Sequence, residues 1–269
     1  MQISKPIDAI FYKHVESTFL HETQEDQLIA RTIDIPNLQF QANIVLSQST
    51  WPENGQPALE LLKTAKRLDS GISDWARSVP ATWSYAIATD LDALSYTKGR
   101  ISNFSPPQVH RYTDFYIARI WNIYRVSRLI ILSIILRATA RLPSDSINGE
   151  QELERFGAER RQKELVNEIC ASVPFLLNHD LSRMALPIAK GKRESDEKSD
   201  IITKAGRYSL IWPLYVGCSV PSIPDNQRRW MRAQLQWIGD SGEPQAKFLS
   251  GLQCQTLLGA PEKFRFYCV

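Results

Sequence analysis

Residues 121–136 combine two arginines with the most apolar run in the sequence. Within this stretch, residues 129–136 are all apolar except for one serine. The run is flanked by Arg128 and Arg137, and it is much shorter than the roughly 20 residues that a membrane-spanning helix needs. We therefore expect a long buried helix here, running from about Val109 to Arg141 and stopping before Pro143.

The arginines at the start of this run need partners. Trp121 and Arg125 are four residues apart, so on a helix the guanidinium can lie over the indole. Arg125 and Arg128 are also helical neighbours, and like charges disfavour each other unless carboxylates, carbonyls or a ligand anion satisfy them. We prefer a structural arginine pair that joins helices, because buried charges are usually paired. The alternative is an anchor for an anion or a carbonyl group in a helix-lined pocket.

Helical periodicity dominates the rest of the chain and predicts an all-α fold, a single irregular multi-helix domain around the long central apolar helix. We expect this domain to cover residues 55–269, with residues 1–54 as an N-terminal extension that packs on it. Alternating apolar residues at 38–46 are the best strand candidate, although an extended surface segment fits them equally well. The charged stretch 190–200 predicts a solvated loop. Further helices are expected at 57–79, 85–97, 152–173 (kinked or ended by Pro174), 204–218, 225–239 and 244–258.

Composition excludes several classes of protein. The net charge is +3, far from the strongly basic surface of a module that binds nucleic acid by itself. The N-terminal residues lack the pattern of a signal peptide. Four widely spaced cysteines have neither zinc-ligand spacing nor the density of a disulfide framework. We interpret them as reduced, mostly buried thiols of an intracellular protein, nuclear or cytoplasmic; they are Cys170, Cys218, Cys254 and Cys268.

The sequence has no catalytic signature: phosphate-binding loops, nucleophile elbows and His-Glu-x-x-His motifs are all missing. We predict no metal and no cofactor, since the four histidines are scattered and His14 and His21 lack a third ligand. His110 and Asp114 are the one plausible acid–base couple, with Tyr112 between them. We favour a hydrogen-bonding role at a helix start for these residues over catalysis.

Several segments together resemble the C-terminal regulatory domain of fungal zinc binuclear cluster transcription factors, known as the fungal-specific transcription factor domain. The resemblance covers roughly residues 55–252 and is strongest at Ile169-Cys170-Ala171-Ser172-Val173-Pro174 and Leu210-Ile211-Trp212-Pro213-Leu214-Tyr215-Val216. Supporting pieces are Leu61-Leu62 through Asp69 to Trp75, Tyr112-x-Asp114, Trp121-Asn122-x-Tyr124-Arg125-x-x-Arg128, Trp230, and Ile238-Gly239-Asp240-Ser241-Gly242.

Members of this family carry an N-terminal six-cysteine zinc cluster that reads DNA, and here no cysteine precedes Cys170. We therefore expect no direct binding of nucleic acid by this chain, whether Met1 is the natural start or marks a truncation. The resemblance implies a regulatory domain that senses a small-molecule metabolite or binds a partner protein, away from membranes, with a homodimer left open. Its ligand contacts would be Trp121, Asn122, Arg125, Arg128, Trp212 and Tyr215.

The second hypothesis is a cofactor-free enzyme of fungal secondary metabolism, a cyclase, isomerase or dehydratase built on the same scaffold. A domain that binds a small molecule needs only one well-placed acid or base to become a catalyst. The groups to test in that case are His110, Asp114, Tyr112, Arg125 and Tyr215.

Overall fold

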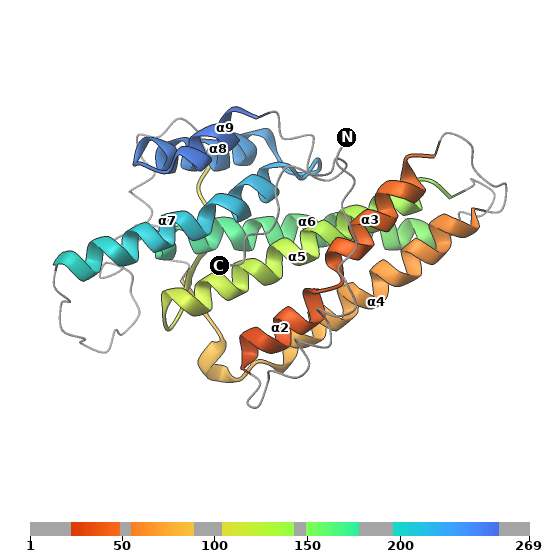
Figure 1. Ribbon diagram of the computed structural model, residues 1–269, viewed down its shortest axis with the longest axis horizontal. Coiled ribbons are helices and arrows are strands. Elements are labelled where there is room, and N and C mark those ends of the chain that lie inside the picture. The colour runs from red at the N-terminus through yellow and green to blue at the C-terminus, as the bar shows by residue number, and fades with distance from the viewer. Residues whose placement is uncertain (1–22, 49–54, 89–103, 143–148, 178–195, 253–269) are drawn as a thin grey trace. The chain divides into compact units, whose positions relative to one another are not determined.

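A computed structural model describes residues 23–48, 55–88, 104–142, 149–177 and 196–252 (Figure 1). Over these residues the chain is all-α, as expected, with one small two-stranded sheet. None of the described helices is both long and apolar enough to span a membrane. The elements are α2 (Gln24–Thr32), α3 (Ile35–Leu46), α4 (Gln56–Ser78), a 3-10 turn (Ala81–Trp83), β1 (Ala86–Ala88), β2 (Val109–Arg111), α5 (Phe115–Thr139), α6 (Gly149–Leu176), α7 (Asp196–Cys218), α8 (Asp225–Asp240) and α9 (Pro244–Gly251).

The described elements group into two compact units, and α5 and α6 each contribute one segment to both. The first unit contains α2, α3 and α4 with residues 127–139 of α5 and 149–162 of α6. The second contains β1, β2, α7, α8 and α9 with residues 115–126 of α5 and 163–176 of α6. We keep the division of the chain after residue 54 as a prediction.

In the first unit, α2 and α3 pack against α4 (Figure 1). The side chain of Thr23 accepts a hydrogen bond from the Asp26 amide while the Asp26 carboxylate accepts one from the Thr23 amide, so a capping box starts α2. The indole N–H of Trp75 on α4 donates to the carbonyl oxygen of Gln24 at 2.8 Å. Trp75 is fully buried with Leu28 and Ile72, and burial of such side chains stabilises this core.

Helix α3 corrects our strand prediction for residues 38–46. Its buried residues are Ile35, Leu38, Ala42 and Leu46, which repeat every three to four positions and form one helical face against α4. The alternation seen in the sequence arises because this face and the half-exposed residues beside it are both apolar.

The second correction concerns the segments before α5. Ala86–Ala88 pairs antiparallel with Val109–Arg111, with Ile87 opposite His110, so 86–88 is a strand where we predicted a helix over 85–97. Residues 89–97 of that prediction lie outside the described part. The expected long helix likewise starts at Phe115, because β2 occupies its first residues and Asp114 caps the helix.

Several helix ends also differ from the sequence-based expectation. Pro174 lies inside the last turn of α6, which continues to Leu176. Helix α7 begins at Asp196, so the predicted loop is wrong over 196–200; a helix can begin in a charged stretch because acidic residues are favoured in its first turn. Residues 190–195 lie outside the described part. Helix α9 ends at Gly251 because Leu252 has an extended backbone, and residues 253–258 of the predicted helix lie outside the described part.

Close helix contacts in the second unit depend on glycines. Helices α7, α8 and α9 pack together, and α8 and α9 lie side by side (Figure 1). A Cβ atom added to Gly206 of α7 would lie 1.9 Å from the carbonyl oxygen of Leu176. A Cβ atom on Gly239 of α8 would lie 2.6 Å from the backbone nitrogen of Lys247 on α9. Larger residues at these two positions would therefore force the helices apart.

Candidate functional site

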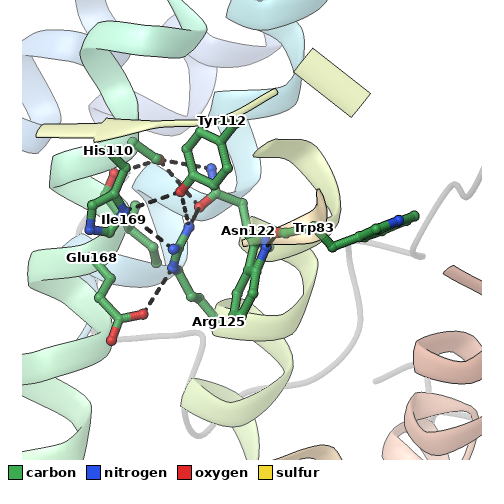
Figure 2. Close-up of polar contacts among 9 residues, drawn as sticks. Trp83, His110, Tyr112, Asn122, Arg125, Glu168 and Ile169 are labelled. Atoms are coloured by element: carbon green, nitrogen blue, oxygen red, sulfur yellow. Dashed lines mark hydrogen bonds and ion pairs between the residues drawn. The ribbon is translucent and has the colours of Figure 1, made fainter. Parts of the chain in front are cut away.

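Polar and aromatic side chains of the second unit gather around Arg125 (Figure 2). Helix α5 supplies three members, β2 and the residue after it supply two, α6 supplies two, and one precedes β1. We call this group the Arg125 cluster: Tyr85, His110, Tyr112, Trp121, Asn122, Arg125, Glu168 and Ser172.

The guanidinium of Arg125 is fully buried and donates in three directions. Its Nε donates to Glu168 Oε2 at 3.1 Å, which forms an ion pair between α5 and α6. Its Nη1 donates to the hydroxyl oxygen of Tyr112 and to Asn122 Oδ1, both at 2.9 Å (Figure 2). A buried arginine is tolerated when its donors and its charge are both satisfied, and this arrangement meets that requirement.

Three aromatic rings surround the same charge. The Cζ atom of Arg125 lies 5.2 Å from the ring centroid of Tyr85, 5.7 Å from that of Trp121 and 5.9 Å from that of Tyr112. The negative faces of aromatic rings attract a cation, and the attraction is stronger away from water. The predicted contact between Arg125 and Trp121 is confirmed. Trp121 is itself held by its indole N–H, which donates to the carbonyl oxygen of Trp83 at 2.7 Å.

His110 closes the other side of the cluster. Its Nδ1 lies 3.1 Å from the Tyr112 hydroxyl and 3.3 Å from Arg125 Nη2, and its ring stacks on Tyr85 with centroids 4.1 Å apart. Arginine can only donate, so we assign Nδ1 as an acceptor and place the imidazole proton on Nε2. The Tyr112 hydroxyl then accepts from Arg125 and donates to His110.

Burial and the Arg125 charge fix the protonation states. Burial, together with the neighbouring Arg125, lowers the pKa of His110 to about 2, so the imidazole is neutral at physiological pH. Burial also raises the pKa of Tyr112, although Arg125 opposes this shift, and the hydroxyl keeps its proton. Burial alone would lower the pKa of Arg125, but Tyr112, Glu168 and Tyr85 outweigh it and raise that pKa.

Asn122 extends the network from Arg125 to α6. Its Oδ1 accepts from Arg125, and its Nδ2 donates to Ser172 Oγ at 3.0 Å. The Ser172 hydroxyl in turn donates to the carbonyl oxygen of Ile169 at 2.7 Å. Both side chains are almost completely buried. Together with the contacts of His110, these hydrogen bonds join β2, α5 and α6.

The other site residues predicted from the sequence are not members of the Arg125 cluster. Asp114 accepts a hydrogen bond from the Ile117 amide at 2.8 Å, so it caps α5, the role that we favoured, and no hydrogen bond joins it to His110. On α7, Trp212 and Tyr215 contact each other, with ring centroids 5.9 Å apart. Ligand binding by these residues stays a prediction.

Arg128 belongs to the first unit, where it forms a two-pronged ion pair with Asp69 of α4. Its Nε donates to Oδ1 at 2.8 Å and its Nη2 to Oδ2 at 2.6 Å. Its Nη1 also lies 3.3 Å from Ser73 Oγ, one turn further along α4. Each of the two neighbouring arginines thus has its own internal carboxylate, which is the structural interpretation that we preferred. Neither charge requires a ligand anion for compensation.

Sequence reasoning missed four partners in these networks: Tyr85, Glu168 and Ser172 around Arg125, and Asp69 opposite Arg128. Glu168 and Ser172 are one turn apart on an otherwise apolar part of α6, and that spacing was a usable signal. Tyr85 carried none, because its role depends on the pairing of β1 with β2.

Among the described residues, neither the potential metal ligands nor the cysteines form a reactive site. No three His, Cys, Asp or Glu side chains there are arranged to hold a metal ion. Cys170 and Cys218 are buried free thiols, and burial raises the pKa of Cys170 to about 12, so it is protonated and inert. Cys254, Cys268, His14 and His21 lie outside the described part.

The chain is similar to the Transcription factor dbaG of Emericella nidulans, with 31% identity over 149 residues. That match covers 55% of this chain but only 33% of the relative, so this chain corresponds to about a third of its length. No family model matches the chain, and no solved structure matches it. The similarity supports a relationship between this chain and fungal transcription regulators.

The Arg125 cluster is chemically a closed, satisfied polar core. Its cation, its hydroxyl and its neutral imidazole each have internal partners, and none of them titrates near pH 7. Such a network fixes the relative positions of β2, α5 and α6. The arrangement supports the shape of the second unit rather than chemistry on a substrate.

Proposed function

We propose that this chain is a regulatory part of a fungal transcription regulator, acting in the nucleus on a small-molecule metabolite or a partner protein. The observation that carries this proposal is the similarity to Transcription factor dbaG, with 31% identity over 149 residues. That relative is described as a transcription factor, and a shared regulatory role is the simplest reason for the similarity.

The physical properties of the chain agree with a regulatory role that leaves DNA contact to another module. A net charge of +3 over 269 residues is small for a protein that must displace the counterions of DNA by itself. The rigid Arg125 cluster would hold the second unit in one conformation, and a sensor needs such a defined state for a ligand or a partner to select.

Within this proposal, a metabolite would contact the aromatic residues among the predicted ligand contacts, Trp212 and Tyr215 on α7 and Trp121 on α5. Aromatic surfaces bury much apolar area at a small cost in side-chain entropy, which suits a largely apolar ligand. The arginines contribute indirectly, because both are engaged with internal carboxylates.

The enzyme alternative loses three of its candidate acid–base groups, His110, Tyr112 and Asp114. A general base must titrate near the operating pH, and the pKa of His110 is lowered to about 2 by burial and by Arg125. Tyr112 keeps its proton because burial raises its pKa, and Asp114 is engaged as a helix cap.

A tethered reporter tests the proposal. The chain is fused to a heterologous DNA-binding module in a filamentous fungus, and expression of a reporter is compared with that from the DNA-binding module alone, with and without a metabolite extract of the source fungus. We expect the fusion to change reporter expression, and Arg125→Met to abolish the effect because it disturbs the second unit. The matched control is Arg229→Met, which replaces an exposed arginine of α8. A fusion that leaves the reporter unchanged under every condition contradicts the proposal.

A further inference from the structure

The middle of α7 carries two cationic side chains and a tyrosine away from its packed side. Lys204 is exposed, and Tyr208, one turn later, is 58% exposed. Gly206 lies on the packed side, where an added Cβ atom would meet the carbonyl oxygen of Leu176. A helix turns by about 100° per residue, so Lys204 and Tyr208 lie opposite Gly206 and Arg207 lies at the border. We call Lys204, Arg207 and Tyr208 the α7 outer face.

The two cations of this face have no carboxylate within the described part of the chain. Arg207 is half-buried, and its Nε atom is buried there without a hydrogen-bond partner. Neither Arg207 nor Lys204 has an ion-pair partner among the described residues. Arg125 and Arg128, in contrast, are each paired with an internal carboxylate. Buried polar groups are normally satisfied and like charges one turn apart repel each other, so an anion from another molecule would complete this pair.

The exposure of the α7 outer face favours a protein as the source of that anion. Small ligands bind in concave sites, whereas Tyr208 is 58% exposed on the convex surface of a helix. Nucleic acid is held by many cations that displace its counterions, and this face has two, in a chain with a net charge of +3. Arginine and tyrosine, moreover, are enriched among the residues that dominate the energy of protein interfaces.

We propose that the α7 outer face binds an acidic helical segment of a partner protein. Lys204 and Arg207 are three residues apart, so carboxylates one turn apart on a partner helix can lie opposite both. Tyr208 then packs on the apolar residues beside those carboxylates. The inference rests on the proposed function for the kind of partner, and it adds the chemistry of that partner. Because one short face makes the contact, binding is of roughly micromolar strength or weaker.

Fluorescence anisotropy with the purified whole chain and a labelled synthetic peptide tests the inference. The probe is a helical peptide of about twenty residues, in which glutamates one turn apart lie beside leucines. The matched peptide has glutamine in place of every glutamate. We expect the glutamate peptide to bind, the glutamine peptide to bind at least tenfold more weakly, and the affinity of the glutamate peptide to fall as salt is added.

Variants of the chain assign the binding to the α7 outer face. Arg207→Met and Tyr208→Ala should each weaken binding at least fivefold. The matched control is Arg229→Met, which removes an exposed arginine of α8 and should leave binding unchanged. Since Arg207 Nε has no hydrogen bond to lose, Arg207→Met should not lower the midpoint of urea unfolding, so a loss of binding is not a loss of folding. The double variant Lys204→Glu, Arg207→Glu should prefer a peptide with lysine in place of glutamate.

The outcomes separate this inference from the proposed function. No binding of the glutamate peptide at several hundred micromolar overturns the inference, and so do equal effects of Arg207→Met and Arg229→Met. A DNA duplex that binds more tightly than the peptide, and that the same variants release, assigns the face to nucleic acid and overturns the inference as well. A silent reporter fusion together with intact peptide binding refutes the proposed function alone, whereas an active fusion without peptide binding refutes this inference alone.

Discussion

Replacement of Arg125 by methionine should lower the free energy of unfolding by about 3–5 kcal/mol, the usual loss when one partner of a buried ion pair is removed. Arg125 is fully buried, and its guanidinium serves Glu168, Tyr112 and Asn122 at the same time. Methionine keeps an unbranched apolar stem but offers no donor to any of them.

The structure indicates how the loss of stability divides among these three partners of Arg125. The Glu168 side chain is 27% exposed, so its carboxylate regains part of its hydration when Arg125 is absent. Asn122 Oδ1 and the Tyr112 oxygen are buried, and each acceptor that loses its donor costs about 1–3 kcal/mol. Arg125→Lys should recover little, because one ammonium group cannot reach all three partners in the planar geometry of a guanidinium.

Urea unfolding, followed by tryptophan fluorescence and by circular dichroism, measures this change. Arg229→Met is the control, since it removes an exposed arginine of α8 and should alter the free energy of unfolding by no more than about 0.5 kcal/mol. A double-mutant cycle of Arg125→Met with Tyr112→Phe should give a coupling energy of about 1–3 kcal/mol. If Arg125→Met costs less than about 1 kcal/mol, the cluster does not stabilise the second unit and the argument fails.

Three further predictions concern other buried groups. His110 takes up a proton below about pH 6.5 when unfolded but stays neutral to about pH 2 when folded, so stability falls as the pH drops through this window. Urea titrations should show a loss of roughly 2 kcal/mol between pH 6.5 and 5 that His110→Gln largely removes. Gly206→Ala should destabilise the chain by about 1–3 kcal/mol or more, because its Cβ would clash with the Leu176 carbonyl; an unchanged melting temperature would contradict this packing. Gln162 is 1% exposed and neither amide atom has a hydrogen-bond partner among the described residues, so Gln162→Met should raise the free energy of unfolding by about 1 kcal/mol, and a loss of stability would show that the amide is satisfied.

The sequence predicts those helices whose ends are set locally. Helix α4 has Pro57 in its first turn and ends before Pro80, and α8 begins after Pro224, so the sequence predicts both within a residue or two of their observed bounds. Strand β1 could not be found in this way, because residues 86–88 are extended only through pairing with residues 109–111 far along the chain. Local periodicity contains no information on such a partner.

The same distinction holds for the candidate site: local spacing predicts some of its contacts, and tertiary packing determines the others. Trp121 and Asn122 precede Arg125 by four and three residues, so helical geometry alone brings each of them next to Arg125. Glu168 and Tyr85 reach Arg125 only through tertiary packing. The sequence therefore predicts only that the arginines pair with internal carboxylates, because unpaired buried charges are costly. It does not identify which carboxylates these are.

Deletion of the gene in the source organism, followed by transcript profiling, tests the central claim most directly. We predict that a defined set of transcripts changes, that the wild-type gene restores them, and that the Arg125→Met variant does not. Unchanged transcripts, together with the loss of a metabolite whose precursor the purified chain converts, would contradict the regulatory account and establish an enzyme.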